Sequence, residues 1–477
     1  MHTPLSFRWL LALPLWLAVL TAQASHIMGG EVSYAPIAST TAGVPRYHVQ
    51  TILYRDPNGI DQYEIMLTCS RNGCGLLGAG SFRQTVSRSE VTSRYALGCP
   101  TGPGYNYQVY SFETDVDLPR GQWTLSVTGE NRIASIRNLT NSGNSGIYIS
   151  AFLDNSLVTE NTSPRFLSTL LPYLCGSQAQ RYSFSAFDSD GDSLVYSFRY
   201  PEENQLPDRN CGTALPYSTL SPHFQLNAAT GAITTQGTPV QPGFYAMVAR
   251  VSEYRRLNGN WQPIGYVTRD ITYLAFNATN TSPRFTGLTL NATTTTQPVD
   301  QLIRVQPGQT VSLALSAADA DAGQQLRFAS QAPAIIPGLR LTTLSASQAK
   351  LTWQVPAGLR PGRYTATVAV LDNGCPVASE EQTLSFLVGP LPLASRGALA
   401  AASTAFPMPF HEQVQFRAAS GGQLVHILDE LGRTVAQLHA EADGRVQWQP
   451  AASLPAGFYL ARGADGRPLA RLLRAAN

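Results

Sequence analysis

The hexapeptide NTSPRF occurs twice in this chain, at Asn161–Phe166 and Asn280–Phe285. The two copies lie 119 residues apart, and the same offset carries Gly243-x-Tyr245 onto Gly362-x-Tyr364. Proline fixes φ and ends a strand, and the small polar residues before it favour a turn. The chain therefore contains a repeated unit, and each hexapeptide indicates a junction between successive β modules.

Length and composition indicate several domains of one class. A chain of 477 residues is too long for one core and predicts three or four domains. Only 13% of the residues are charged, strand-like runs are short, and no helical period is evident. This profile is typical of secreted β sandwiches, so we predict an all-β fold of tandem β-sandwich domains. A formal net charge of +2 gives no indication of a nucleic-acid partner.

The N-terminus predicts export. Arg8 precedes an apolar run, Trp9–Leu20, and Ala22-Gln23-Ala24 offers small residues for cleavage. The run is too short to span a bilayer, so we expect residues 1–24 to be a signal peptide. No later segment is long and apolar enough to span, so we expect no transmembrane segment in the mature chain.

The repeat offset and the shifts in composition predict the domain boundaries. Strand-like runs such as Tyr47–Arg55 and Gln62–Cys69 precede the first repeat, and each repeat has the spacing of a sandwich of about seven strands. The predicted organisation is an N-terminal β domain (25–159), repeat 1 (160–278), repeat 2 (279–389), a linker (390–404) and a small C-terminal β sandwich (405–477).

Export permits disulfides between the six cysteines. Repeat 1 is longer than repeat 2 around Cys211, and repeat 2 lacks counterparts of Cys175 and Cys211. We infer a Cys175–Cys211 bridge that closes the longer loop, worth about 4 kcal/mol on the loop-closure model. Cys99 is expected to pair with Cys69 or Cys74, which leaves one of these two and Cys375 unassigned.

Repeat 1 resembles cadherin-like and related Ig-like modules in the segments SFSAFDSDGDSLVYSF, FQLNAATGAIT and GFYAMVARVSE. In those families an Asp-rich turn follows one strand and an acidic residue closes a late strand, and both contribute to calcium sites. The resemblance implies that these positions are candidate Ca²⁺ ligands. They are Asp188, Asp190, Asp192 and Glu253 in repeat 1, and Asp319, Asp321 and Asp372 in repeat 2.

The spacing of the aspartates supports the same hypothesis. Asp188-x-Asp190-x-Asp192 places three carboxylates in five residues, and Ca²⁺ prefers six to eight hard oxygen ligands. The alternative is a solvated acidic turn. The segment is not an EF-hand loop, because Ser193 stands where that loop requires glycine. Repeat 2 has no third carboxylate, since Gln324 follows Gly323 there.

The N-terminal segments ASHIMGGEVSY, YRD, ENRIASIRNL and YISAFLDN resemble the leading domain of a group of Bacteroidetes exported proteins that carry cadherin-like repeats. The resemblance implies an exported protein of the same organisation. It implies no biochemical activity.

The C-terminal segments FPMPF, VHILDELGRTV and LPAGFYLARGADGRPLARLLR resemble the C-terminal sorting domain of the type IX secretion system. The resemblance implies recognition by that machinery, passage across the outer membrane, and surface attachment or release. The residues that carry the sorting motif are Phe406, Pro407, Pro409, Phe410, Gly432, Gly457 and Tyr459.

No sequence motif indicates catalysis: HExxH, Gly-x-Ser-x-Gly and Walker A patterns are absent, so we predict a non-enzymatic protein. Tyr254, Trp261 and Tyr266 could stack on sugar rings, but their neighbours alternate like packed strand residues. We expect an adhesion protein or displayed binding module whose partner is a surface protein or glycan, with the repeats as stalk or binding surface. The alternatives are a structural envelope component and a carbohydrate-binding or polysaccharide-active protein.

Overall fold

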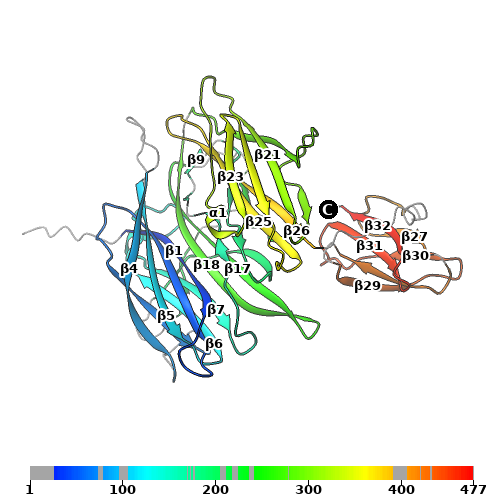
Figure 1. Ribbon diagram of the computed structural model, residues 1–477, viewed down its shortest axis with the longest axis horizontal. Helices are drawn as coiled ribbons and strands as arrows, with labels where there is room; N and C mark the ends of the chain where they lie inside the picture. Colours follow the sequence, from blue (N-terminus) through cyan, green and yellow to red (C-terminus); the bar gives the residue numbers. More distant parts are fainter. Residues whose placement is uncertain are drawn as a thin grey trace, which may run out of the picture. The chain divides into compact units, whose positions relative to one another are not determined.

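A computed structural model describes most of the chain, and it is all-β, as the composition predicted (Figure 1). The described helical segments are one 3₁₀ turn, Ser142–Asn144, and one α-helical turn, α1 (Ala332–Ile335). The chain divides into two compact units, Met1–Pro390 and Leu391–Asn477. The described residues are 26–73, 79–95, 106–168, 170–171, 173–175, 178–204, 211–217, 224–235, 241–277, 279–389, 405–418, 420–429 and 432–475.

The N-terminal part is a sheet of seven antiparallel strands in the order β1-β2-β5-β4-β3-β6-β7. Every second residue of these strands faces a common core, as the burial pattern of β2 shows. The strands are β1 (Ile27–Ile37), β2 (Arg46–Arg55), β3 (Glu64–Arg71), β4 (Phe82–Tyr95), β5 (Asn106–Asp117), β6 (Gln122–Gly129) and β7 (Ile147–Asp154).

Both edges of this sheet pair with one strand of repeat 1, β18 (Asn260–Phe276). Gly265–Val267 of β18 pair with β7, and Arg269–Ile271 pair with β1, so β18 closes the seven strands into a hydrogen-bonded ring. A Cβ atom at Gly29 would collide with the carbonyl of Asp270, which explains why glycine stands where β1 meets β18. Pairing of both edges removes two open strand edges.

Buried ion pairs fix β18 in this position. The Arg269 Nε lies 2.9 Å from a carboxylate oxygen of Glu31 on β1. Arg132, which follows β6, makes two hydrogen bonds with the carboxylate of Asp270, and both side chains are fully buried. Replacing one partner would leave an uncompensated buried charge, so these pairs specify where β18 lies.

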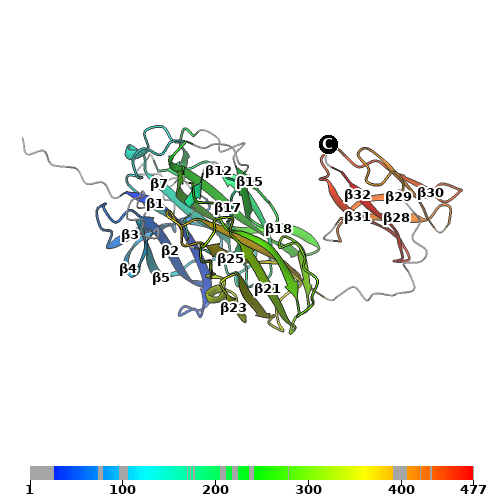
Figure 2. The same ribbon diagram turned by 90° about the horizontal axis from the view of Figure 1, so that it is seen from above.

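A long hairpin carries β18. β17 (Gly243–Leu257) pairs with β18 along its whole length, and the turn between them is Asn258-Gly259, both with positive φ. Asn-Gly is the preferred sequence for such a two-residue turn. Figure 1 shows this hairpin between the N-terminal strands and repeat 2, and Figure 2 shows it from above with β12 (Ser193–Arg199) at its outer edge.

The remaining strands of repeat 1 are short: β8 (Arg165–Phe166), β9 (Tyr173–Cys175), β10 (Arg181–Ser183), β11 (Ala186–Phe187), β13 (Glu202–Glu203), β14 (Thr213–Ala214), β15 (Phe224–Leu226) and β16 (Ala232–Thr235). Their buried side chains join those of the N-terminal sheet in one hydrophobic core. The boundary predicted near Glu160 therefore separates sequence units that share a core and a sheet.

Repeat 2 is a β sandwich of two four-stranded sheets, β19-β21-β24-β23 and β20-β26-β25-β22. Trp353 and Phe386, from opposite sheets, meet edge to face at 4.9 Å in its core. The strands are β19 (Arg284–Leu290), β20 (Leu302–Val305), β21 (Thr310–Ala318), β22 (Arg327–Ala329), β23 (Leu339–Ser345), β24 (Gln348–Gln354), β25 (Gly362–Leu371) and β26 (Ser379–Val388).

The two repeats pack side by side. The hydroxyl of Ser183 in repeat 1 lies 2.8 Å from that of Thr383 in repeat 2, and both are buried. Arg181 donates a hydrogen bond to Gln382 at 2.6 Å, and Leu167 of repeat 1 lies within the core of repeat 2. The described residues of the first unit thus form one continuous body, in which repeat 2 is fixed against repeat 1.

The second unit is a small sandwich with its own core. Its sheets are β27-β30 and β29-β28-β31-β32. The strands are β27 (Val414–Arg417), β28 (Leu424–Leu428), β29 (Thr434–His439), β30 (Arg445–Trp448), β31 (Gly457–Gly463) and β32 (Pro468–Arg474).

The cysteines and the apolar segments complete the fold. Cys69 is a buried free thiol, which removes it as the partner of Cys99. Cys211 is disulfide-bonded, but the side chain of Cys175 lies outside the described residues, so the Cys175–Cys211 pairing stays a prediction. The predicted signal peptide also lies outside them. In the part of the chain that the structure describes, no helix has the length and apolarity needed to cross a membrane.

Candidate functional site

The first NTSPRF segment attaches repeat 1 to strand β1. Ser163 exchanges hydrogen bonds with the backbone of Tyr34: its N–H donates to the Tyr34 carbonyl at 2.9 Å, and its hydroxyl accepts from the Tyr34 N–H at 2.8 Å. The N–H of Thr162 donates to Asp190 at 2.7 Å. The junction residues are therefore held between β1 and the Asp-rich turn.

Asp188 shapes that turn. Its Oδ1 accepts the backbone N–H of Asp190 at 2.9 Å and that of Asp192 at 3.2 Å, and Gly191 adopts a φ of 77°. Asx side chains commonly bond to the backbone two residues on, which explains this local fold. The Oδ2 of Asp188 is buried and has no hydrogen-bond partner.

The turn brings three predicted ligands together. Asp188, Asp192 and Glu253 are all buried, and one oxygen of each lies within 4.8 Å of the others. Glu253 is 0% exposed and accepts hydrogen bonds from Asn161 at 3.1 Å and from the Tyr34 hydroxyl at 3.4 Å. We refer to these three carboxyl groups, with Asn161, as the first acidic cluster.

Arg255 supplies a cation to this cluster, and sequence reasoning missed it. Its Nε and Nη2 donate to the two carboxylate oxygens of Asp192 at 2.7 and 2.6 Å. Its Nη2 also donates to the side-chain Oδ1 of Asn161 at 2.7 Å and lies 3.4 Å from a carboxylate oxygen of Asp190. A forked contact of this kind is the strong geometry for arginine and a carboxylate.

Burial changes the protonation of the two remaining carboxyl groups. Burial, together with the charge of Asp192, raises the pKa of Asp188 to about 7. Burial and the charge of Asp188 raise the pKa of Glu253 well above its ordinary value. Both shifts disfavour the ionised forms of these two buried carboxyl groups, so the cluster resists a full negative charge on each of them.

Repeat 2 builds the same junction with a different donor. Asn280 donates to Asp372 at 2.8 Å, and the N–H of Thr281 donates to Asp321 at 2.6 Å, as at the first junction. The Nε2 of Gln324 donates to the Asn280 carbonyl at 2.5 Å and to Asp321 at 3.4 Å.

Asp319 repeats the role of Asp188 by accepting the N–H of Asp321 at 2.8 Å. We refer to Asp319, Asp321, Asp372 and Asn280 as the second acidic cluster. A neutral amide of Gln324 here stands where the first cluster uses the guanidinium of Arg255.

The donor set of the first cluster can be compared with what calcium needs. Ca²⁺ takes six to eight oxygen ligands. Arg255 occupies both oxygens of Asp192 and the carbonyl of Asn161, so the Oδ2 of Asp188 is the unpartnered buried oxygen that remains. Arg255 thus places one positive charge beside the three carboxyl groups that could hold a metal ion.

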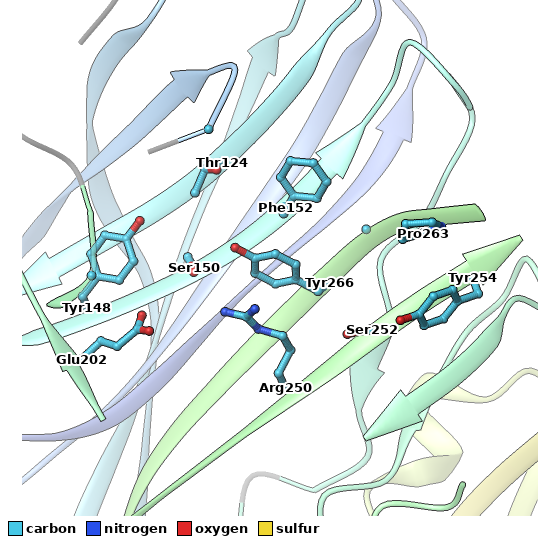
Figure 3. A pocket seen from close by; sticks show the side chains of 13 residues that line it. Thr124, Tyr148, Ser150, Phe152, Glu202, Arg250, Ser252, Tyr254, Pro263 and Tyr266 are labelled. Carbon is cyan, nitrogen blue, oxygen red and sulfur yellow. The ribbon is translucent and has the colours of Figure 1, made fainter. Parts of the chain in front are cut away.

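A second site lies on the outer face of the sheet, opposite the core. It is a pocket of about 430 Å³ at the strands β6, β7, β18 and β17, with β13 at one side (Figure 3). Phe152 stacks on Tyr266 with ring centroids 5.5 Å apart, and the guanidinium of Arg250 lies 3.9 Å from the centre of the Tyr266 ring.

Tyr254 and Tyr266, whose neighbours in the sequence indicated packing, line this pocket. Trp261 is 43% exposed on the β17–β18 hairpin. Sequence reasoning also missed Arg250. A signal was present, because Arg250, Ser252 and Tyr254 alternate along β17 and alternate residues share one face of a strand.

The residues predicted to form a sorting motif lie in the second unit. Phe410 and Tyr459 are buried and both pack against Trp448, with ring centroids 5.6 and 5.0 Å from it. Phe406 is 78% exposed. Gly432 and Gly457 have positive φ, and Pro407 and Pro409 follow cis peptide bonds beside Phe406 and Met408.

Comparison with known proteins gave structural similarities alone. No protein-family model matches the sequence, and no curated protein matches it. The chain is similar to the protocadherin gamma B4 extracellular domain, with 14% identity over 95% of this chain and 80% of that one, at a TM-score of 0.17. It is also similar to human protocadherin-24 EC1-2 (14% identity, 49% and 100% covered, TM-score 0.17). Titin domains z1z2, solved in complex with telethonin, match at 12% identity (48% and 98% covered, TM-score 0.16).

Proposed function

We propose that this protein is an exported, non-enzymatic surface protein that acts in adhesion as a displayed binding module. The observation that supports this proposal is the union of the N-terminal sheet, repeat 1 and repeat 2 into one body through shared strands and cores. A spacer would need repeats joined in series, whereas these repeats pack side by side. The first unit is therefore a binding head, which we define as residues 26–389.

The experiment that tests adhesion is deletion of the gene in the native bacterium, followed by measurement of attachment to surfaces and to other cells. We expect attachment to fall while the envelope stays intact, and expect a copy encoding the full chain to restore it. Unchanged attachment with increased sensitivity to detergent would instead support a structural role in the envelope.

We propose that the second unit is a sorting module read by type IX secretion in a Bacteroidetes host. Its separate core and the burial of Phe410 and Tyr459 support a module that folds around its motif residues. The test is a chain that ends at Gly389, expressed in the native bacterium. We expect it to be lost from the surface and retained in the periplasm, while another cargo of the machinery reaches the surface normally. Surface display of the shortened chain would contradict the proposal.

We further propose that Arg255 takes the place of calcium in the first acidic cluster. Its forked contact with Asp192 supports this, since it compensates the charge of the cluster without a metal. The test is thermal unfolding of the mature full-length chain in millimolar Ca²⁺ and in EDTA. We expect the two melting temperatures to agree.

The variant Arg255→Met sharpens this test, because it frees Asp192 and leaves Asp188 and Glu253 in place. A ligand that binds only the folded state at 100 times its Kd adds about 2.7 kcal/mol of stability. We expect Ca²⁺ to raise the melting temperature of Arg255→Met. The control is Arg256→Met, at an exposed residue on the same strand, and we expect Ca²⁺ to leave its melting temperature unchanged. A calcium-dependent shift of the unaltered chain, abolished by Asp188→Asn, would show that calcium displaces Arg255.

A further inference from the structure

The pocket in Figure 3 is built on a face that the fold itself does not use. Tyr148, Ser150 and Phe152 alternate along β7 and point away from the core, whereas Ile149 and Ala151 between them point into it. Tyr148 is 5% exposed and belongs to no hydrophobic core cluster.

Two charged side chains line the pocket, and their charged groups make no hydrogen bond with a described residue. The Nε of Arg250 is buried without a hydrogen-bond acceptor, and no described residue accepts a hydrogen bond from its guanidinium. The carboxyl group of Glu202 on β13 lines the same pocket, and no described residue donates to it. A buried donor without an acceptor is costly, so the Arg250 Nε is available to a ligand, and the partly exposed carboxyl group of Glu202 is accessible to the same ligand.

The absence of an ion pair between them is itself informative. Burial lowers the pKa of Arg250 and raises the pKa of Glu202, although each is attracted by the charge of the other. The guanidinium of Arg250 instead lies 3.9 Å from the centre of the Tyr266 ring. Contact with an aromatic ring restricts the orientations of a guanidinium, so less freedom is lost when its N–H groups bind a ligand in the pocket.

We propose that this pocket binds a saccharide, with Arg250 and Glu202 as the residues that recognise its hydroxyl groups. The guanidinium donates hydrogen bonds to ring and hydroxyl oxygens, and the carboxylate accepts from hydroxyl groups. The rings of Tyr148 and Tyr266 supply the apolar surface that the C–H face of a sugar requires. A volume of about 430 Å³ falls in the range of ligand pockets and admits one or two sugar rings.

Further lining groups favour a sugar over a charged ligand. The hydroxyl side chains of Thr124, Ser150 and Ser252 add groups that both donate and accept. An anion would meet the carboxylate of Glu202, and a cation would meet Arg250. A neutral ligand rich in hydroxyl groups satisfies both. A zwitterionic amino acid is the competing class, with its carboxylate at Arg250 and its ammonium group at Glu202.

This inference rests on the proposed function, because it names the class of partner that the binding head would take. The first experiment is titration calorimetry of the mature full-length chain with four neutral disaccharides, maltose, cellobiose, lactose and chitobiose, and with glycine. A glycan array then identifies the preferred linkage. We expect binding of at least one neutral saccharide and none of glycine.

Variants assign the binding to this pocket. Arg250→Met keeps the apolar stem over Tyr266 and removes the donors, and Glu202→Gln removes the charge of the acceptor. We expect each to weaken saccharide binding roughly tenfold or more, the effect of losing hydrogen bonds to a charged group. Arg256→Met is the matched control, since Arg256 is exposed on the same strand and donates a hydrogen bond to the Gly259 carbonyl. Melting temperatures close to that of the unaltered chain show that the variants fold.

The outcomes separate this inference from the proposal of adhesion. Saccharide binding that survives in Arg250→Met and Glu202→Gln would overturn the pocket as its site, as would binding of glycine in place of sugars. If the protein binds no glycan on the array but its gene is still needed for attachment, the saccharide proposal would be wrong. The proposal that the first unit is a binding head would then remain. Loss of attachment in cells that carry Arg250→Met would support both.

Discussion

The two acidic clusters share a junction sequence and differ in how each neutralises its charge. In the first, Asn161 connects Glu253 to the guanidinium of Arg255. In the second, Asn280 connects Asp372 to the amide of Gln324. The first cluster therefore places a full positive charge beside its carboxyl groups, whereas the second places only the neutral amide dipoles of Asn280 and Gln324 beside them.

The difference follows from a single position. The offset of 119 residues that aligns Glu253 with Asp372 also aligns Arg255 with Gly374. A Cβ atom at Gly374 would collide with the side chain of Asn280, so no arginine could stand there without moving the junction. Repeated sequence thus fixes the backbone of a junction, while one side chain decides its electrostatics.

Removing the cation should have the largest effect. Arg255→Met leaves Asp192 buried and unpaired, and breaking a buried ion pair costs about 3–5 kcal/mol. The corresponding Gln324→Met removes one amide from partly exposed surroundings and should cost about 1 kcal/mol. Urea unfolding of both variants measures the difference. Equal losses would show that Arg255 is not the essential cation.

A buried carboxyl group between the repeats, Glu381, can be used to divide the pH dependence of the unfolding free energy between this residue and the two acidic clusters. Burial raises the pKa of Glu381 from 4.5 to about 7. Its neutral form therefore stabilises the fold fully below about pH 4.5, and this stability is lost as the pH rises to about 7.

The variant Glu381→Gln cannot ionise and should not lose this stability. Relative to the unaltered chain it should gain roughly 3 kcal/mol between pH 4 and pH 8. Urea unfolding at each pH measures the gain, and the slope that remains in the variant belongs to the clusters and other groups. An identical pH profile for both proteins would contradict a raised pKa at Glu381.

The two junction asparagines offer a matched pair of intermediate effect. Asn161→Ala removes hydrogen bonds to Glu253, which is fully buried, and to Arg255, whose side chain is 12% exposed, so we expect a loss of about 2–3 kcal/mol. Asn280→Ala removes bonds to Asp372 and Gln324, and we expect about 1–2 kcal/mol. Differential scanning calorimetry ranks the two variants. A larger loss at Asn280 would reverse the comparison.

The smallest change in the free energy of unfolding should come from placing an arginine in the second acidic cluster. Gln324→Arg places a guanidinium near Asp321, which is only partly buried, so we expect a change below about 1 kcal/mol. Salt should weaken any gain, because partly exposed ion pairs are screened. Melting temperatures at low and high ionic strength measure this. A gain that survives high salt would indicate that the second cluster accepts a buried ion pair.

Local sequence predicted the fold class and many strands. The strand-like runs Tyr47–Arg55 and Gln62–Cys69 correspond to β2 and β3, with bounds that differ by one or two residues. Strands β1 and β4 were missed. In β4, the segment RQTVSRSEVTSRY is polar at most positions, so it lacks the alternation by which a strand is recognised.

Contacts distant in sequence were beyond prediction from periodicity. The pairing of β18 with β1 joins residues some 240 positions apart, and no local pattern encodes such a partner. Within the predicted site, Asp188, Asp192 and Glu253 do come together. Arg255 was missed because a search for calcium ligands considers only acidic side chains. A position-by-position alignment of the two repeats would have found Arg255, since it aligns with Gly374.

The closure of the N-terminal sheet by β18 imposes an order of assembly. Strands β1 and β7 are complete once residue 154 has been made, yet the strand that pairs with both arrives about a hundred residues later. Until then the nascent sheet exposes two unsatisfied edges, which invite association with other chains. A chain built in this way needs these two edges protected between the synthesis of β7 and the arrival of β18.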